Sequence, residues 1–324
     1  MIGRFAFTFA MLLCGAASAA DKVVFQIDYL PAGDKAYAYA TVQQGFFAAE
    51  GIDATVVSGR GGNDVLTRMA TGATDFGTVG LTALLQTTAE NPVPIKAIYS
   101  MYTKQPDGTI VRKSSGIRTI ADMKGRTLAA TSVSSSYALW DFVVRKNGLE
   151  PSDIIRKQVD PAATAAMLVT GQVDAVSSWV TTAPRFIEVL KQAGQESHFM
   201  PWADYGLEGY GLVLMTSERM LKENPNLAKR FVRAFAKGFA FALDNRDATI
   251  ADLKKMVPEI DPRIARLQLD ATEPLIRNEI STRDGMGAFS KDMLTRTWNV
   301  IAASQNLPLD KVDPESVVDR SFMP

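Results

Sequence analysis

The stretch FQIDYLPAGDKAY, from Phe25 to Tyr37, decides the fold of this chain. The apolar run that leads into it, from Val23 to Ile27, predicts a buried strand, which Pro31 and Gly33 end in a loop. Residues 36–45 then predict a helix that ends at a glycine, as helices often do. A strand, a loop and a helix N-terminus in this order present backbone N–H groups and a positive dipole end to a ligand.

The loop within this stretch carries three kinds of side chain that could contact a ligand. Asp28 supplies a carboxylate, Tyr29 an aromatic ring and Lys35 an ammonium group. For this loop alone, an ordinary solvated turn is an equally good interpretation, because connections between strands and helices usually lie on the surface. The choice between the two depends on the rest of the chain.

The composition is that of a globular protein with a large core. The chain has 324 residues, of which 47% are hydrophobic and 22% charged, and its formal net charge is zero with a pI near 6.6. This length predicts two domains. The balanced charge argues against a nucleic-acid-binding protein, although a local basic patch could be hidden in the average.

Residues 1–20 have the features of a signal peptide. Arg4 gives a short positive region, residues 5–13 give an apolar region, and Ala17-Ser18-Ala19 forms a small-residue cleavage site. The apolar region is too short to span a bilayer. We therefore expect cleavage after residue 19 or 20 and export of the remaining chain.

Cys14 offers an alternative to this interpretation, a lipoprotein signal. Leu13 stands where such signals normally have a small residue, so a soluble exported form is favoured. Because Cys14 is the only cysteine, the mature chain would have no disulfide, thiolate nucleophile or cysteine metal site. An export signal without disulfides fits a bacterial periplasm, and no later stretch is apolar enough over sufficient length to predict a membrane-spanning helix.

The first half of the chain alternates strands with helices. Strands are predicted at 54–57, 74–79 and 95–101, and each of the first two is followed by a loop and a helix. The loop 59–64 is rich in glycine but is not a P-loop, because the required Lys-Ser/Thr pair is missing. This alternation predicts a parallel α/β sheet, whose ligands lie beyond the carboxyl ends of the strands.

The pattern begins again in a second unit. Strands are predicted at 109–112, 126–130 and 173–179, and the hydroxyl-rich run 131–136 precedes a helix from Tyr137 to Lys146. Such a run can cap the helix and can also hold an anion. A further strand near Tyr210 is expected to rejoin the first unit, and the chain from Glu218 onward is mostly helical.

The sequence therefore predicts a two-lobed α/β protein with a hinge and a central ligand cleft. We assign residues 1–20 to the signal peptide, 21–112 and 208–324 to lobe 1, and 113–207 to lobe 2. Both crossings between the lobes are short, which would allow hinge motion.

The candidate ligand contacts follow predicted strands or begin predicted helices. Tyr29, Tyr137 and Trp179 are candidates for stacking, with core packing as the alternative for each, and the polar candidates could instead serve as caps or solvated side chains. The full set is Asp28, Tyr29, Lys35, Arg60, Asn63, Gly80, Ser134, Ser135, Tyr137 and Trp179.

The opening motif resembles that of a known family. The pattern Asp28-Tyr29, Pro31, Lys35-Ala36, Ala40, Gly45-Phe46-Phe47 and Glu50-Gly51-Ile52 is similar to the start of the NMT1/THI5-like periplasmic solute-binding proteins. Later matches are 72–77, 122–127 and 171–175, so the resemblance covers about residues 22–220. It implies the type II periplasmic binding protein fold. It also implies a role in ABC importers, whose cargoes in this group include thiamine-precursor pyrimidines, riboflavin, alkanesulfonates, taurine and nitrate.

Two departures from the family pattern bear on the ligand. The pyrimidine and riboflavin members usually have Trp-x-Pro-x-x-x-His in the opening motif, whereas this chain has Tyr29 and Lys35 at those positions. A ring remains for stacking, but a permanent cation replaces a titratable imidazole. We expect an aromatic or anionic solute, with a pyrimidine precursor or riboflavin as the alternative.

The residues favour binding over catalysis. The single histidine, His198, is expected in a polar turn, and no catalytic or metal-binding motif of the common types occurs. A pyrimidine-synthesis enzyme, as found in the wider group, is the weaker alternative. We expect a monomer without a cofactor whose partners are a small molecule and the permease of an inner-membrane ABC importer.

Overall fold

A computed structural model describes residues 19–130, 136–160 and 162–323. Its first sheet has the strand order β2-β1-β3-β10-β4, in which only β10 runs antiparallel to its neighbours. The placement of β10 confirms that the chain returns to the first sheet near Tyr210. The strands are β1 (Asp21–Ile27), β2 (Ile52–Ser58), β3 (Phe76–Gly80), β4 (Ile95–Ser100) and β10 (Leu212–Ser217).

The second sheet repeats this arrangement in the order β7-β6-β8-β5-β9. In it β5 is antiparallel to both β8 and β9, so neither sheet is purely parallel as the alternation of elements had predicted. Two short strands, β7 and β9, were not predicted. The strands are β5 (Asp107–Arg112), β6 (Thr127–Ala130), β7 (Ile155–Gln158), β8 (Ala175–Trp179) and β9 (Ser197–Pro201).

Two details of the second sheet correct expectations from the sequence. Residues 107–112, which we had assigned to lobe 1, pair only within the second sheet as β5. His198 lies on β9 opposite Val111 instead of in a turn, because Ser197–Pro201 forms an edge strand beside β5.

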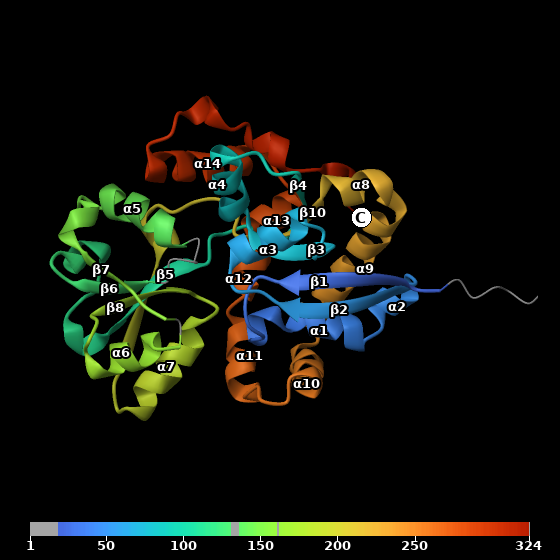
Figure 1. Cartoon of the computed structure of the whole chain (residues 1–324). Coiled ribbons are helices and arrows are strands. Elements are labelled where there is room, and N and C mark those ends of the chain that lie inside the picture. The colour runs from blue at the N-terminus through green and yellow to red at the C-terminus, as the bar shows by residue number, and fades with distance from the viewer. Residues whose placement is uncertain (1–18, 131–135, 161, 324) are drawn as a thin grey trace, which may run out of the picture.

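Helices cover both sheets (Figure 1). Prolines begin several of them: Pro225 is the first residue of α9 and Pro262 that of α11, where a missing N–H costs nothing. Lobe 2 holds α5 (Ser136–Lys146), α6 (Thr164–Thr170) and α7 (Ala183–Gln192). The others are α1 (Ala36–Gln43), α2 (Phe46–Ala49), α3 (Gly62–Ala70), α4 (Leu81–Glu90), α8 (Glu218–Glu223), α9 (Pro225–Asp244), α10 (Arg246–Met256), α11 (Pro262–Asp270), α12 (Glu273–Ile276), α13 (Glu279–Asp284) and α14 (Lys291–Gln305).

An aromatic stack joins α9 to the first sheet. Phe231, Phe235 and Phe239 recur every four residues and so lie on one face of the helix. Phe231 stacks on Phe76 of β3 with ring centroids 3.8 Å apart, and Phe25 of β1 meets Phe231 edge-on at 5.4 Å. This packing fixes β1, and with it the start of the loop that follows Ile27.

The two lobes are connected by residues 101–106 and 202–211. Gln105 Nε2 donates to the carbonyl oxygen of Tyr210 at 2.7 Å, which ties the two crossings together. One apolar core continues from lobe 1 into lobe 2, with Trp140 and Trp202 5.3 Å apart between ring centroids. Helix α14 packs against both α4 and α5 and so touches both lobes (Figure 1).

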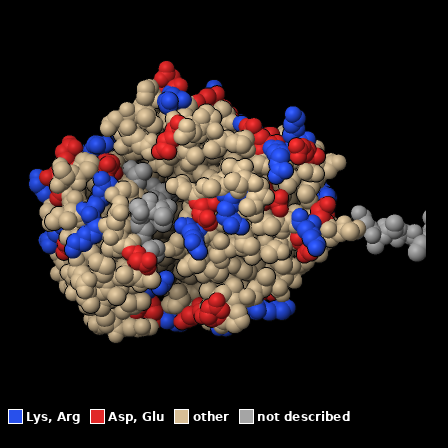
Figure 2. All heavy atoms as spheres, in the orientation of Figure 1, with Lys and Arg blue, Asp and Glu red and all other residues tan. Residues whose placement is uncertain are grey.

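The surface is mixed in charge. Figure 2 shows acidic and basic side chains interspersed over most of the visible face, in keeping with the zero net charge. Within the described residues, none of the helices combines the length and the apolar composition needed to cross a membrane. The predicted signal peptide falls on residues 1–20, of which 1–18 lie outside the described residues.

Candidate functional site

The loop that follows β1 is held in place by α11. The backbone N–H of Gly33 donates to the side-chain oxygen of Gln268, a buried hydrogen bond of 3.0 Å. The approach is so close that a Cβ on Gly33 would lie 1.7 Å from the carbonyl oxygen of Ala265. Residue 33 therefore has to be glycine for the loop to lie against this helix.

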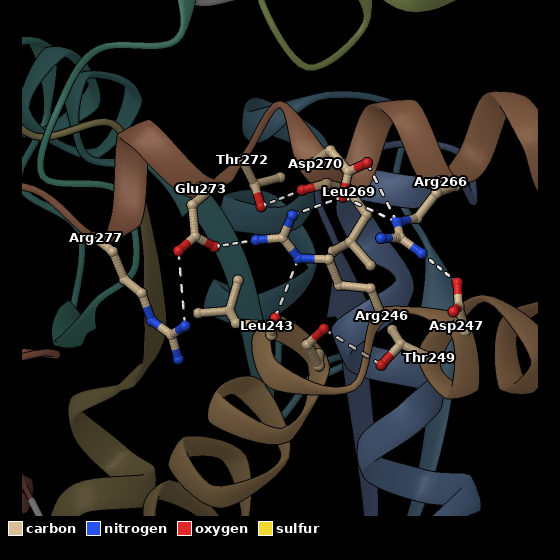
Figure 3. Close-up of polar contacts among 11 residues, drawn as sticks. Leu243, Arg246, Asp247, Thr249, Arg266, Leu269, Asp270, Thr272, Glu273 and Arg277 are labelled. Atoms are coloured by element: carbon tan, nitrogen blue, oxygen red, sulfur yellow. Dashed lines mark hydrogen bonds and ion pairs between the residues drawn. The ribbon is translucent and has the colours of Figure 1, made fainter.

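A network of ion pairs fixes α11 against its neighbours (Figure 3). Arg246, at the start of α10, contacts Asp270 at 2.7 Å and Glu273 at 2.6 Å. Arg266 of α11 also reaches Asp270, at 3.0 Å. Because the network joins α10, α11 and α12, the helix that supports the loop is braced from two sides.

The loop carries a buried charge cluster made of Asp28, Asp34 and Lys35. Lys35 Nζ lies 2.9 Å from Asp28 Oδ1 and 3.3 Å from Asp34 Oδ2, and only 3% of the lysine side chain is exposed. Burial raises the pKa of Asp28 although Lys35 opposes this. Burial alone would lower the pKa of Lys35, but the two carboxylates raise it well above its ordinary value, so this lysine stays protonated.

Lobe 2 meets this cluster through the end of β8 and the turn after it. The Trp179 ring centroid lies 4.9 Å from Lys35 Nζ, within the range of a cation–π contact. Thr181 Oγ1 donates to Asp34 Oδ2 at 2.9 Å across the boundary between the lobes. The indole N–H of Trp179 donates to Asp107 Oδ1 at 3.1 Å, and the Ser136 hydroxyl donates to the same oxygen.

Polar atoms with unused hydrogen-bonding capacity gather at this cluster. The Tyr102 hydroxyl is buried here without a hydrogen-bond partner among the described residues, whereas Asp28 Oδ1 and Lys35 Nζ, both also buried, have each other as ion-pair partners at 2.9 Å. Burial is the main reason that the pKa of Tyr102 is raised, and the charges of Lys35, Asp34, Tyr37 and Asp28 also act on it. Tyr37 stands beside them and donates from its hydroxyl to Thr78 Oγ1 at 3.1 Å. A ligand entering here would find both donors and acceptors.

Three of the predicted site residues meet in this cluster, namely Asp28, Lys35 and Trp179. Tyr29 is half-buried beside it. Burial raises the pKa of Tyr29. The positive charge of Arg185 opposes this rise and the negative charge of Asp160 adds to it, so charged groups of lobe 2 lie close enough to Tyr29 to act on it. Gly80 ends β3 and is buried.

The other predicted site residues have local contacts. Arg60 and Asn63 are exposed; the backbone N–H of Arg60 donates to Asp64, and the carbonyl of Asn63 accepts from Thr67 in the same helix. The Tyr137 ring stacks under Arg156 at 4.9 Å, within lobe 2. Ser134 and Ser135 lie outside the described residues.

Four residues in the cluster or in contact with its neighbours were not predicted from the sequence: Asp34, Tyr102, Asp107 and Thr181. Asp34 stands within the opening motif, and its place beside Lys35 was the available signal. Asp107 follows Gln105-Pro106 at the crossing between lobes, and Thr181 follows Trp179 by two residues, but neither spacing predicts a contact with lobe 1. Tyr102 is a buried aromatic residue like many others.

A metal site is not apparent in this part of the fold. Across residues 19–130, 136–160 and 162–323, no group of three or more His, Cys, Asp or Glu side chains is arranged to hold a metal ion. The carboxylates of Asp28 and Asp34 instead share the ammonium of Lys35.

Known proteins resemble this chain over most of its length. It is 26% identical over 313 residues to the riboflavin-binding protein RibY of Chloroflexus aurantiacus, covering 94% of this chain and 86% of the relative. The periplasmic aliphatic sulphonate binding protein SsuA of Escherichia coli has the same two-lobed fold, with a TM-score of 0.73 at 18% identity over 95% of this chain and 94% of SsuA.

The same fold also occurs in an enzyme. The desulfurization enzyme DSZB superposes with a TM-score of 0.58 at 18% identity, covering 93% of this chain and 97% of DSZB. The family model described as NMT1/THI5 like matches residues 33–249, about two thirds of the sequence. This chain therefore belongs to the NMT1/THI5-like family.

Proposed function

We propose that the protein is the periplasmic solute-binding component of an ABC importer and that its ligand is an uncharged or cationic planar compound with N–H donors. The ligand would lie between loop 28–35 of lobe 1 and residues 177–181 of lobe 2. Its contacts with both lobes would favour the closed state, which docks on the permease. The observation that carries the ligand class is that two buried carboxylates, Asp28 and Asp34, already pair with the single ammonium of Lys35.

The charges already present in the cluster disfavour an anionic ligand. The sequence alone favoured an anionic ligand because Lys35 provided a cation, but Lys35 already has two carboxylates within 3.3 Å. A ligand anion would compete with both of them in a buried setting, where an uncompensated charge is costly. A ligand N–H would instead donate to the Asp28 carboxylate beside Lys35 in a charge-assisted hydrogen bond.

Two half-buried rings support a ligand with a planar part. Trp179 and Tyr29 come from opposite lobes and both retain some exposure. Ring-on-ring contact adds about 0.5–1.5 kcal/mol beyond the area that it buries. A conjugated heterocycle would use these rings as well as the Tyr102 hydroxyl, which has no partner among the described residues.

Binding is favoured over catalysis by the state of the cluster. An amine acts as a nucleophile only when it is deprotonated, and the pKa of Lys35 is raised well above its ordinary value by Asp28 and Asp34. His198 contacts the carbonyl oxygen of Arg118 at 3.1 Å on β9, within lobe 2. The cluster is thus built to hold hydrogen-bonding groups.

One observation supports a second ligand class, an organic anion. Arg185 lies close enough to Tyr29 for its charge to act on the tyrosine pKa, and it is exposed at the start of α7. A sulfonate or carboxylate could pair with Arg185 at the edge of the boundary without entering the charge cluster. The two classes make opposite predictions for a mutation at Asp28.

The experiment is calorimetric titration at pH 7.5 with 4-aminopyrimidine, riboflavin, benzoate and taurine. We expect micromolar binding of a nitrogen heterocycle, at least tenfold weaker binding to Asp28→Asn, and unchanged binding to Lys22→Met, an exposed control on β1. Micromolar binding of benzoate or taurine that Asp28→Asn leaves unchanged and Arg185→Gln abolishes would overturn the ligand class.

The importer role has its own test. Mass spectrometry of protein purified from periplasm under native conditions should find a bound small molecule that is neutral or cationic at pH 7. Turnover of that molecule by the protein alone would contradict a purely binding role.

A further inference from the structure

We propose that Asp107 is a positioning residue that fixes Trp179 at the boundary between the lobes, and that the charge on its carboxylate sets how firmly the indole holds Lys35 of the facing lobe. The inference rests on the proposed function, since it concerns the same site between the lobes. The proposal connects that site to the crossing between the lobes, because Asp107, the first residue of β5, directly follows the crossing 101–106.

The geometry makes Asp107 the anchor of the indole. Asp107 and Trp179 are direct partners in the antiparallel register of β5 and β8, so the two side chains leave the sheet side by side. Asp107 Oδ1 accepts from the indole N–H at 3.1 Å and from the Ser136 hydroxyl at the start of α5. Only 2% of Asp107 is exposed, so water does not compete freely for these hydrogen bonds.

The charge of Asp107 reaches Lys35 through the ring. An indole N–H that donates to an anion is more strongly polarised than one that donates to a neutral acceptor, and hydrogen-bonded groups polarise one another in a low-dielectric setting. The ring face then carries more negative charge and attracts the ammonium of Lys35, 4.9 Å away, more strongly. Protonation of Asp107 would reverse this effect and loosen the contact.

The surroundings of Asp107 place its titration near neutral pH. Burial raises the pKa of Asp107 to about 6, and the hydrogen bonds from Ser136 and Trp179 oppose that rise. The charged groups on the facing lobe are Asp28, Asp34 and Lys35. The ammonium of Lys35 pairs with both carboxylates. On lobe 2, α5 carries Asp141, which pairs with Arg156 at 3.0 Å, and β9 carries His198. A modest change in pH would therefore switch the charge of Asp107.

The test needs no ligand. The fluorescence of Trp179, taken as the difference between the parent protein and Trp179→Phe, is followed from pH 5 to pH 8. We expect a change with a midpoint near 6, absent in Asp107→Asn and kept in His198→Gln, which removes the only histidine of the chain. Asp28→Asn is the second control, because the pKa of Asp28 is also raised by burial; this variant should keep the fluorescence change if Asp107 is the group that titrates.

Small-angle scattering of the same proteins reports the separation of the lobes. The radius of gyration should be larger at pH 5 than at pH 8 in the parent, and this pH dependence should be lost in both Asp107→Asn and Trp179→Phe. A fluorescence midpoint that persists in Asp107→Asn, or scattering that depends on pH equally in all variants, would overturn the proposal. Because neither readout uses a ligand, failure of the proposed ligand class leaves both results interpretable.

Discussion

Two contacts of charged side chains between the lobes, both among the described residues, differ greatly in character. One is the buried contact in which Lys35, held by Asp28 and Asp34, faces Trp179. The other joins α11 to α7, where Arg263 contacts Glu188 through both guanidinium nitrogens at 2.7 and 3.0 Å. The lysine side chain is 3% exposed and the arginine side chain 57% exposed.

The difference in burial determines which contact can control ligand specificity. A buried charge is costly unless it is paired, so changes in the first contact should alter stability, pH dependence and ligand choice together. An exposed pair is screened by water and salt, so the second contact should act only weakly on the balance between open and closed forms. The same helix, α11, serves both, because Gln268 holds the loop of the buried contact and Arg263 makes the exposed one.

The largest effect is expected from Lys35→Met. This change leaves Asp28 and Asp34 buried without their cation, and breaking a buried pair in this way costs about 3–5 kcal/mol. Urea unfolding at pH 7.5 measures the loss against the parent and against Lys22→Met. At pH 5 the loss should shrink, because burial raises the pKa of Asp28 and favours its protonated form. An equal loss at both pH values would contradict the role assigned to the pair.

Asp107→Asn should stabilise the protein, and only at higher pH. The pKa of Asp107 is raised from 3.8 to about 6, so the folded state binds a proton that the unfolded state releases, and the parent loses stability as pH rises between these values. That difference amounts to about 3 kcal/mol above pH 7 and disappears below pH 4. Unfolding at pH 4 and pH 8 gives both numbers. If the free energy of unfolding of Asp107→Asn differs from that of the parent by the same amount at pH 4 and pH 8, the charged form of Asp107 does not destabilise the folded state.

Gly33→Ala tests the support of the buried contact. The new methyl group would meet the carbonyl oxygen of Ala265, so the loop must move away from α11, at a cost of about 1–3 kcal/mol. Thermal unfolding measures this cost. Adding Ala265→Gly should not restore stability, because the clash is with the backbone and not with the alanine methyl. Full recovery in that double variant would locate the strain elsewhere.

The sequence predicted the fold well because the fold depends on local patterns. Short apolar runs ending in Pro, Gly or polar residues marked eight of the ten strands, including the return of the chain at residues 212–217. The two missed strands, Ile155–Gln158 and Ser197–Pro201, are edge strands with few buried side chains, so they lack the apolar run that marks a central strand. The same lack of local signal hid the antiparallel direction of β5.

The site was predicted only in part because its contacts join distant residues. Asp28 and Lys35 lie seven positions apart in one loop, so a motif could suggest both. Thr181 and Asp34 are 147 positions apart, and their hydrogen bond exists only after both lobes have formed. The pairing of Lys35 with Asp28 and Asp34 of its own loop is seen only in the structure, and it is the reason that we propose a hydrogen-bond donor instead of an anion as the ligand.

The smallest effect is expected at the exposed pair of Arg263 and Glu188. It is the most direct test of whether burial separates the two contacts. Glu188→Gln and Arg263→Gln should change unfolding little, because the Arg263 side chain is largely exposed and an exposed pair is screened by water and salt. Gln192 Nε2 also donates to Glu188 Oε1 at 3.1 Å, so the glutamate keeps one partner when Arg263 is lost.

A double-mutant cycle of these two changes, read by the radius of gyration and by unfolding, isolates the coupling between them. The coupling should be measurable in about 0.02 M salt and vanish near 1 M, where the screening length falls to roughly 3 Å. Exchanging the charges with Arg263→Glu and Glu188→Arg should restore the radius of gyration of the parent. At an exposed site the attraction depends on the two charges being opposite, not on which residue carries which charge. The buried contact should show none of this salt dependence, because burial shields Lys35 and its carboxylates from dissolved ions. A coupling at the exposed pair that is as large in 1 M salt as in dilute buffer would remove the distinction, and α11 would then hold the lobes together by one mechanism instead of two.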